Sequence, residues 1–258
     1  MQPDLKVISL VSVGQHPKSG RARRAEQDAR AVELGLSLCG ERLEMVHAGE
    51  GEEQVIRSYL GMGLPRMTLL QQSDSSDAVP VLCDYLDKQT PDIVLSGVRA
   101  ESGEASGMVP YLLAEKLGWP LVSRIAEIGE VKDGVAEVLQ ALPRGQRRAV
   151  KVRLPFVASV DMAAEEPRQS AFGPGQRARI EGQGVSEVAD SERGEWTVSP
   201  ARKKPKRLKV VKAKTAADRF KAATAKAQGG GGKVLKNETP AEQAQAVLDL
   251  LVEEGVLR

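Results

Sequence analysis

The chain of 258 residues has few aromatic residues, cysteines and histidines, and no long hydrophobic run. Its two cysteines, Cys39 and Cys83, lack CxxC spacing, and only two histidines accompany them, which argues against a disulfide framework or a zinc site. We expect both cysteines to be reduced thiols in apolar surroundings. No apolar run approaches the ~18 residues of a membrane span, and the N-terminal stretch lacks the pattern of a signal peptide. These absences predict a cytoplasmic protein with no direct membrane insertion and no metal site.

Charge is unevenly distributed along the chain. Residues 201–236 hold thirteen Lys or Arg against one acid, Asp218, so this stretch carries +12. The total is +2, so the remainder carries −10. Such a basic arm could reach for nucleic acid, a membrane surface, a partner subunit or the chain's own body. Phe220 is its one aromatic residue, and this argues against a nucleic-acid platform, which interleaves stacking positions.

Strand-like and helical runs alternate through the first 117 residues. We predict strands at residues 7–13, 43–48, 67–70 and 92–95, and helices at 25–39, 53–60, 78–87 and 108–117. This alternation is typical of an α/β fold with a doubly wound, mostly parallel sheet covered by helices on both faces.

The pattern changes after residue 120. Residues 121–128, 135–142, 149–154 and 156–160 read as antiparallel strands that extend one edge of the sheet. Residues 165–200 have no periodic apolar face and read as loop. Thr239 and Glu242 then start an amphipathic helix, which must dock on something because a short helix is marginal alone. We therefore divide the chain into an α/β domain (1–164), a loop and linker (165–200) and an extended C-terminal arm ending in a helix (201–258).

Ligands of open α/β sheets bind beyond the carboxyl ends of the strands. Three loops lie there, at residues 14–24, 48–51 and 96–107, and the last is rich in Gly, Ser and Ala and leads into a helix. Small residues let backbone N–H groups approach an anion, and a helix N-terminus favours negative charge. Loops of this composition are more often simple tight turns than phosphate cradles, and this one matches neither the dinucleotide fingerprint nor the P-loop.

The sequence shows no catalytic set. His16 and His47 both fall near the expected carboxyl edge, but there is no nucleophile elbow, no HExxH motif and no Cys/His pair. A histidine placed there more often makes a hydrogen bond or contacts a nucleotide than acts as a general base. We expect a protein that holds a nucleotide and is not an enzyme.

Four segments in collinear order carry a family resemblance. They are PDIVLSGVRAESGEASGMVPYLLAEKLGWP, MVHAGEGEEQVIRSYLGMGLPRMTLL, LPFVASVDMAAEEPRQSAF and TPAEQAQAVLDLLVEEGVL. Together they resemble the β subunit of electron transfer flavoproteins over most of residues 6–180 and the last twenty or so. The chain departs from the family at residues 25–29, where relatives have Asn-Pro-Phe-Asp-Glu, and at residues 101–106, where their loop is rich in Asp and Gln.

The resemblance implies an adenine-nucleotide α-hydrolase-like fold and a heterodimer with a larger α subunit. Such heterodimers share one FAD and carry electrons from flavin-dependent dehydrogenases toward a quinone oxidoreductase and the respiratory chain. The β subunit also holds AMP, or a second FAD in some members. The chain is most similar to a divergent bacterial branch associated with demethylation of methylated glycines, and its basic arm is then the extension that wraps the α subunit.

Site residues follow from matching this sequence to the family. The resemblance assigns nucleotide contacts to a set on the strand ends and the loop, namely Leu10, Ala48, Gly97, Arg99, Ala100, Ser102, Gly103, Ser106, Gly107 and Met108. It points His16 toward the shared flavin, although an exposed loop histidine fits the sequence equally well. It assigns Ala171 and Phe172 to dehydrogenase docking, the alternative being that Phe172 folds back onto its own loop.

Two other classes of protein share some of these features. An adenine-nucleotide-binding regulator of the universal-stress class would have the same sheet without the Glu-Glu-Pro-Arg segment or the arm. A nucleic-acid-binding protein would use residues 201–236 but would need a structured motif that the sequence lacks.

Overall fold

The computed structural model describes residues 5–50, 53–197, 199–200, 215–217, 220, 235–236 and 238–253. The chain forms two compact units, Met1–Trp196 and Thr197–Arg258. Most of the basic arm expected at residues 201–236, and with it the expected wrapping of a partner, lies outside the described residues.

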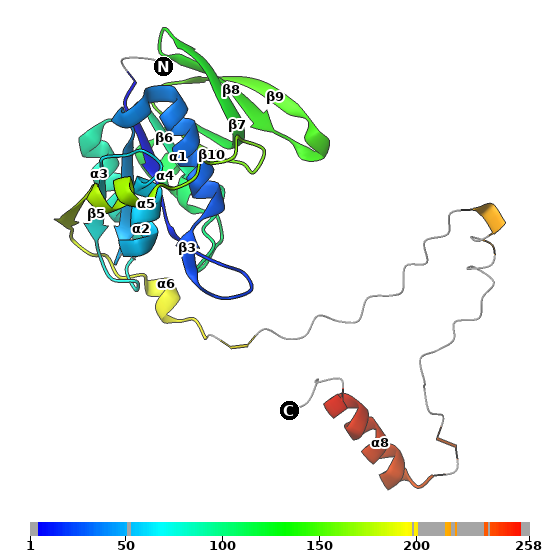
Figure 1. Ribbon diagram of the computed structural model, residues 1–258. Coiled ribbons are helices and arrows are strands. Elements are labelled where there is room, and N and C mark those ends of the chain that lie inside the picture. Colours follow the sequence, from blue (N-terminus) through cyan, green and yellow to red (C-terminus); the bar gives the residue numbers. More distant parts are fainter. Residues whose placement is uncertain are drawn as a thin grey trace. The chain divides into compact units, whose positions relative to one another are not determined.

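A nine-stranded sheet forms the centre of the first unit (Figure 1). Its strand order is β11-β5-β4-β1-β6-β10-β7-β8-β9. The strands are β1 (Val7–Leu10), β4 (Glu44–Gly49), β5 (Arg66–Gln71), β6 (Ile93–Gly97), β7 (Leu121–Lys132), β8 (Val135–Ala141), β9 (Arg147–Arg153), β10 (Phe156–Val160) and β11 (Arg179–Gly184). A small hairpin, β2 (Val13–Gln15) and β3 (Ala22–Arg24), stands apart from this sheet.

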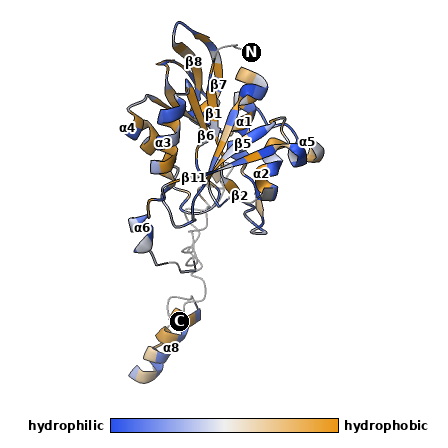
Figure 2. Ribbon diagram, turned by 90° about the vertical axis from the view of Figure 1, so that its left-hand side faces the viewer, coloured by the Kyte–Doolittle hydropathy of each residue, from blue (hydrophilic) through white to orange (hydrophobic). Residues whose placement is uncertain are grey.

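Helices cover both faces of the sheet, as the sequence predicts. One hydrophobic cluster joins α1 (Glu26–Cys39) and α2 (Glu53–Leu60) to alternate strand residues such as Val7. The other joins α3 (Ala78–Gln89) and α4 (Val109–Leu117) to the intervening residues, such as Ile8. Figure 2 shows hydrophobic residues along the central strands β1 and β6. Successive side chains of the strands thus pack into two hydrophobic cores, one on each face of the sheet. The predicted doubly wound fold is confirmed.

Both cysteines are free thiols in these cores. Cys39 is buried on the α1 side and Cys83 is half-buried on the α3 side. Burial raises the pKa of the Cys39 thiol to about 11, so it is protonated at neutral pH.

The prediction of four antiparallel strands over residues 121–160 is wrong for the last of them. β10 lies between β6 and β7 and is parallel to both, whereas the pairs β7–β8 and β8–β9 are antiparallel. All five residues of β10 are buried. A strand buried on both faces reads as a continuous apolar run, which belongs inside a parallel sheet.

Residues 165–200 contain regular structure where the sequence predicts loop. α5 (Phe172–Arg177) packs beside α2, β11 adds a parallel strand to the β5 edge, and α6 (Ser191–Gly194) follows. β11 has the sequence RIEGQG and exposes five of its six residues. Backbone hydrogen bonds hold such an edge strand in place without an apolar face, so no periodic pattern marks it in the sequence.

The second unit contains the C-terminal helix α8 (Pro240–Glu253). Glu242 Oε2 accepts a hydrogen bond of 2.8 Å from the Thr239 N–H, and the Glu242 N–H donates to Thr239 Oγ1 at 3.4 Å. This reciprocal capping box confirms the predicted start of the helix. Across the described residues, none of the helices combines the length and the hydrophobicity that crossing a membrane requires.

Candidate functional site

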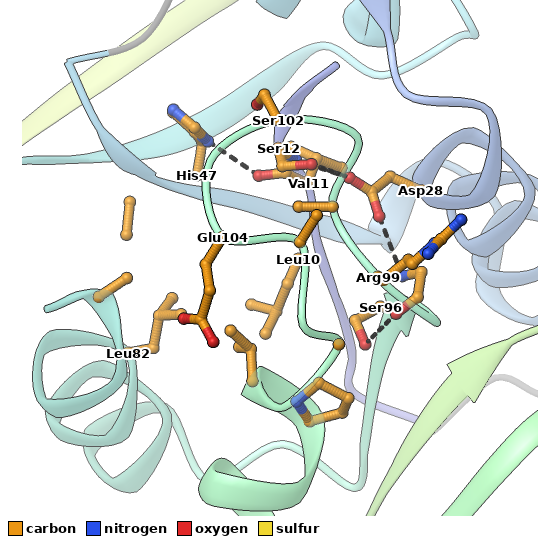
Figure 3. A pocket seen from close by; sticks show the side chains of 18 of the residues that line it. Leu10, Val11, Ser12, Asp28, His47, Leu82, Ser96, Arg99, Ser102 and Glu104 are labelled. Carbon is orange, nitrogen blue, oxygen red and sulfur yellow. Dashed lines mark hydrogen bonds between the residues drawn. The ribbon is translucent and has the colours of Figure 1, made fainter. Parts of the chain in front are cut away.

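A cavity of about 250 Å³ lies at the carboxyl ends of β1, β4 and β6 (Figure 3). β1 and β6 are neighbours in the sheet, and the helices that follow them, α1 and α4, cover opposite faces. The cavity therefore occupies the topological switch point, where α/β proteins bind ligands.

Most of the residues that the sequence assigns to a nucleotide come together here. The cavity is lined by Leu10, Ala48, Gly97, Arg99, Ala100, Ser102, Ser106 and Gly107. Gly103 and Met108 belong to the same loop but do not line the cavity. Contact between these residues and a nucleotide stays a prediction.

Polar contacts fasten the loop between β6 and α4 to the rest of the domain. The Glu101 carboxylate accepts hydrogen bonds of 2.9 Å from both Nε and Nη2 of Arg23, and one of 3.0 Å from the Glu26 N–H. Ser102 Oγ donates to the Val13 carbonyl at 2.7 Å. Glu101 thus serves as the loop's anchor to β3 and α1, and the backbone around it is set in place before any ligand arrives.

The two glycines of this loop differ in their surroundings. Both have positive φ, 69° at Gly103 and 76° at Gly107. A Cβ at Gly107 would lie 2.7 Å from the Val98 carbonyl oxygen, whereas a Cβ at Gly103 would meet nothing within 4 Å. Close packing therefore requires glycine at position 107, while position 103 requires only the left-handed backbone conformation.

The N-terminus of α4 lies at the cavity wall. Val109 and Pro110, the first two residues of the helix, line the cavity. Met108 occupies the N-cap position, and within the described chain no side chain caps the helix there. Pro110 has no N–H, and the Tyr111 N–H donates to the Met108 carbonyl at 3.0 Å, so the helix offers partial positive charge here more than free donors. This end of the cavity can therefore hold an anion.

Asp28 is a site residue that the sequence reasoning missed. Its carboxylate accepts hydrogen bonds from the Ser12 N–H and Oγ, at 2.8 and 2.5 Å, and from the Gly97 N–H at 3.0 Å. It thereby joins the ends of β1 and β6 beneath the cavity. Burial raises the pKa of this carboxyl to about 6, against the hydrogen bonds, which favour the charged form. Its place on the buried stripe of α1, next to Ala29 and Val32, was the available signal.

His47 lines the cavity as a neutral imidazole. Burial lowers its pKa, and its Nδ1 lies 2.8 Å from the Val11 carbonyl oxygen. Since a carbonyl can only accept, Nδ1 carries the proton and Nε2 is left as an acceptor. Among the described residues, His47 has no hydrogen bond to a serine or cysteine, the arrangement that an activated nucleophile needs.

His16 and Phe172 lie away from this cavity. His16 is in the turn of the β2–β3 hairpin and lines a separate hollow with Arg23, Arg99 and Met162. Its Nδ1 accepts hydrogen bonds from the Lys18 and Ser19 N–H groups at 3.3 and 3.2 Å. Phe172 begins α5, follows Ala171, and is 77% exposed.

The fold and the cavity define an α/β protein that holds a small ligand at the switch point of its sheet. A family model described as "Electron transfer flavoprotein domain" matches residues 19–191. The chain is 53% identical to the "Electron transfer flavoprotein subunit beta" of Chromohalobacter salexigens over 261 residues, covering 100% of this chain and 98% of the relative. It is 24% identical to the "Putative electron transfer flavoprotein subunit YgcR" of Escherichia coli over 163 residues, covering 60% of this chain and 61% of that protein.

The chain therefore belongs to the electron transfer flavoprotein family, as a β subunit. It is an electron-transfer protein and not a catalytic enzyme, and the resemblance found in the sequence is confirmed. These matches give no support to the universal-stress-type or nucleic-acid-binding alternatives.

Proposed function

We propose that this chain pairs with an electron transfer flavoprotein α subunit, and that the heterodimer holds one FAD. In this proposal the heterodimer works in the cytoplasm. It takes electrons from flavin-dependent dehydrogenases, among them enzymes that demethylate methylated glycines, and passes them to a membrane quinone oxidoreductase. The full-length similarity to a β subunit supports the pairing. In this proposal residues 165–200 serve partner recognition and residues 201–258 wrap the α subunit.

We propose AMP as the ligand of the cavity. The observation that carries this assignment is the cavity's two-sided lining. Leu10, Ala48 and Leu82 offer apolar surface for an adenine. The loop at Gly107 offers backbone N–H groups for a phosphate, and the start of α4 adds partial positive charge. A cavity of about 250 Å³ suits a mononucleotide such as AMP and is too small to enclose a whole dinucleotide such as a second FAD.

The test is to co-express the chain with its α subunit, denature the purified complex with acid, and identify the small molecules released. We expect FAD and AMP in equal amounts. Release of FAD alone would contradict the nucleotide assignment, and a second equivalent of FAD would replace AMP with FAD.

The β2–β3 hairpin is our candidate for the flavin contact. His16 lines an open hollow with the cations Arg23 and Arg99, and it has a ring nitrogen engaged by the hairpin backbone, which fixes the direction of the ring. In this proposal the hollow faces the flavin held by the α subunit.

Phe172 is our candidate for docking to the dehydrogenase. A buried aromatic at an interface often carries much of the binding energy, and this ring is exposed in the free chain. Phe172→Ala should reduce electron transfer from the dehydrogenase about tenfold, equivalent to ~1.4 kcal/mol, with flavin content unchanged. Unchanged transfer rates over a range of dehydrogenase concentrations would contradict this role.

A further inference from the structure

The segment from Ala164 to Arg179 is tied to the domain through its backbone. Arg30 Nη1 donates to the Ala164 carbonyl, Arg24 Nη1 donates to the Arg168 carbonyl at 3.4 Å, and the Arg179 N–H donates to the Pro65 carbonyl at 2.9 Å. This chain segment thus has a fixed course over α1 and α2, even though few of its side chains are buried.

Glu33 makes the most extensive of these contacts. Its carboxylate accepts from Nε of Arg168 at 2.8 and 3.0 Å, from Nη2 at 2.6 Å, and from the Arg168 backbone N–H at 3.0 Å. Glu33 is 8% exposed, whereas the Arg168 side chain is 49% exposed. Burial favours the neutral acid, but the hydrogen bonds from Arg168 prevail and lower the pKa of Glu33, so the pair is ionised at neutral pH. Side-chain and main-chain donors from one residue fix both the position and the direction of the chain there.

A second set of contacts lies on both sides of Phe172 in the chain. Arg57 Nη1 lies 3.0–3.2 Å from the carbonyl oxygens of Gly175, Gln176 and Ala178, and the Ala171 N–H donates to the Gly61 carbonyl at 2.9 Å. A Cβ at Gly175 would lie 2.5 Å from the Arg57 carbonyl oxygen, so α5 touches α2 through backbone.

Phe172 therefore sits between two fastened points, yet its ring is 77% exposed. A residue that stapled its own loop would bury its ring. Holding the backbone while leaving the ring in solvent presents the ring to another molecule, and it removes the entropy loss that ordering a mobile loop would add to binding.

We propose that Glu33 is a positioning residue for partner docking: through Arg168 it holds the segment so that Phe172 is presented ready-made to an apolar pocket of the electron-donating dehydrogenase. This inference rests on the docking role of Phe172 proposed above. Glu33 contacts neither the flavin nor the nucleotide cavity in this account and acts through Phe172 alone.

The test uses the full heterodimer and a flavin dehydrogenase that reduces the wild-type complex. Glu33→Gln removes the negative charge that binds Arg168. Arg168→Gln removes the positive charge of the same pair, at the residue whose side chain is more exposed. Asp87→Asn is the matched control, since it removes one exposed acid from α3 on the other face of the sheet. Hydrogen exchange of peptides covering residues 165–172 reports on the segment, and steady-state kinetics report on docking.

We expect Glu33→Gln and Arg168→Gln each to speed hydrogen exchange in residues 165–172. Each should also raise the KM for the dehydrogenase about fivefold, with kcat and the flavin spectrum unchanged. Asp87→Asn should change neither. In a Phe172→Ala background, Glu33→Gln should add nothing further to the KM, because its effect passes through that ring.

Unchanged hydrogen exchange in both Glu33→Gln and Arg168→Gln would overturn the inference. A Glu33→Gln effect on the KM that adds fully to that of Phe172→Ala would overturn it as well. If Phe172→Ala raises the KM but Glu33→Gln and Arg168→Gln do not, the positioning role of Glu33 is wrong and the docking role of Phe172 stands. If Phe172→Ala leaves the KM unchanged, the docking role of Phe172 is wrong, and the positioning role is overturned with it.

Discussion

The loop between β6 and α4 offers a matched pair of substitutions, Gly107→Ala and Gly103→Ala. Both glycines have left-handed backbone conformations, with φ of 76° and 69°. Both variants therefore carry the same conformational penalty, about 1–2 kcal/mol for an alanine. Beyond that penalty, their surroundings make them differ.

At Gly107 the new Cβ would lie 2.7 Å from the Val98 carbonyl oxygen and 3.3 Å from the Arg99 Cβ. Relieving that overlap moves backbone in the cavity wall, at a further cost of about 1–3 kcal/mol. At Gly103 the methyl group points into open space. We therefore expect Gly107→Ala to destabilise the domain by about 2–5 kcal/mol and to lose bound nucleotide, and Gly103→Ala to lose about 1–2 kcal/mol and keep it.

The assay is nucleotide content of the purified heterodimer, measured after acid release, together with urea unfolding of each variant. Comparable nucleotide content and comparable stability in the two variants would refute the reasoning, because the carbonyl overlap is the main structural difference between them. Loss of nucleotide from Gly103→Ala alone would show that the ligand lies against Gly103, and the proposed contact near Gly107 would be wrong.

Three further substitutions test other parts of the site. The folded-state pKa of Asp28 is about 6 against an ordinary 3.8, so the free energy of unfolding should fall by about 3 kcal/mol as pH rises from below 4 to above 6. Asp28→Asn should flatten this pH dependence in urea unfolding. An unchanged pH dependence would exclude Asp28 as its source. His16→Ala should shift the flavin spectrum and potential, and identical values would count against the flavin contact. Arg23→Gln should release Glu101, lower stability by about 1 kcal/mol and speed nucleotide loss on dialysis several-fold; wild-type retention would show that this pair does not hold the loop.

Strong local patterns made much of the fold predictable. Alternating strand and helix runs predicted the parallel sheet, and Asp77, in a Ser/Asp cluster before α3, caps that helix by accepting a hydrogen bond from the Val79 N–H. The capping box at Thr239 likewise predicted α8. These signals are local in sequence, so a single chain reveals them.

Features that depend on distant partners were not predictable. The place of β10 beside β6 depends on pairing between residues 63 apart in the chain, such as Phe156 and Ile93, and β11 is held by backbone pairing with β5. The helical pattern places Asp28 on the buried stripe of α1, but its role emerges only when β1 and β6 meet around it. For the same reason the Glu33–Arg168 pair, 135 residues apart, left no trace in the sequence.

The most direct test of the account is flavin reduction in the reconstituted heterodimer. The chain, tagged and co-expressed with its α subunit, is purified and mixed without oxygen with dimethylglycine dehydrogenase and dimethylglycine, while the flavin absorbance is followed. We predict a yellow complex whose flavin is reduced only when dehydrogenase and substrate are both present. A colourless complex, or a bound flavin that stays oxidised with this and other flavin dehydrogenases, would contradict the claim that this chain is half of an electron carrier.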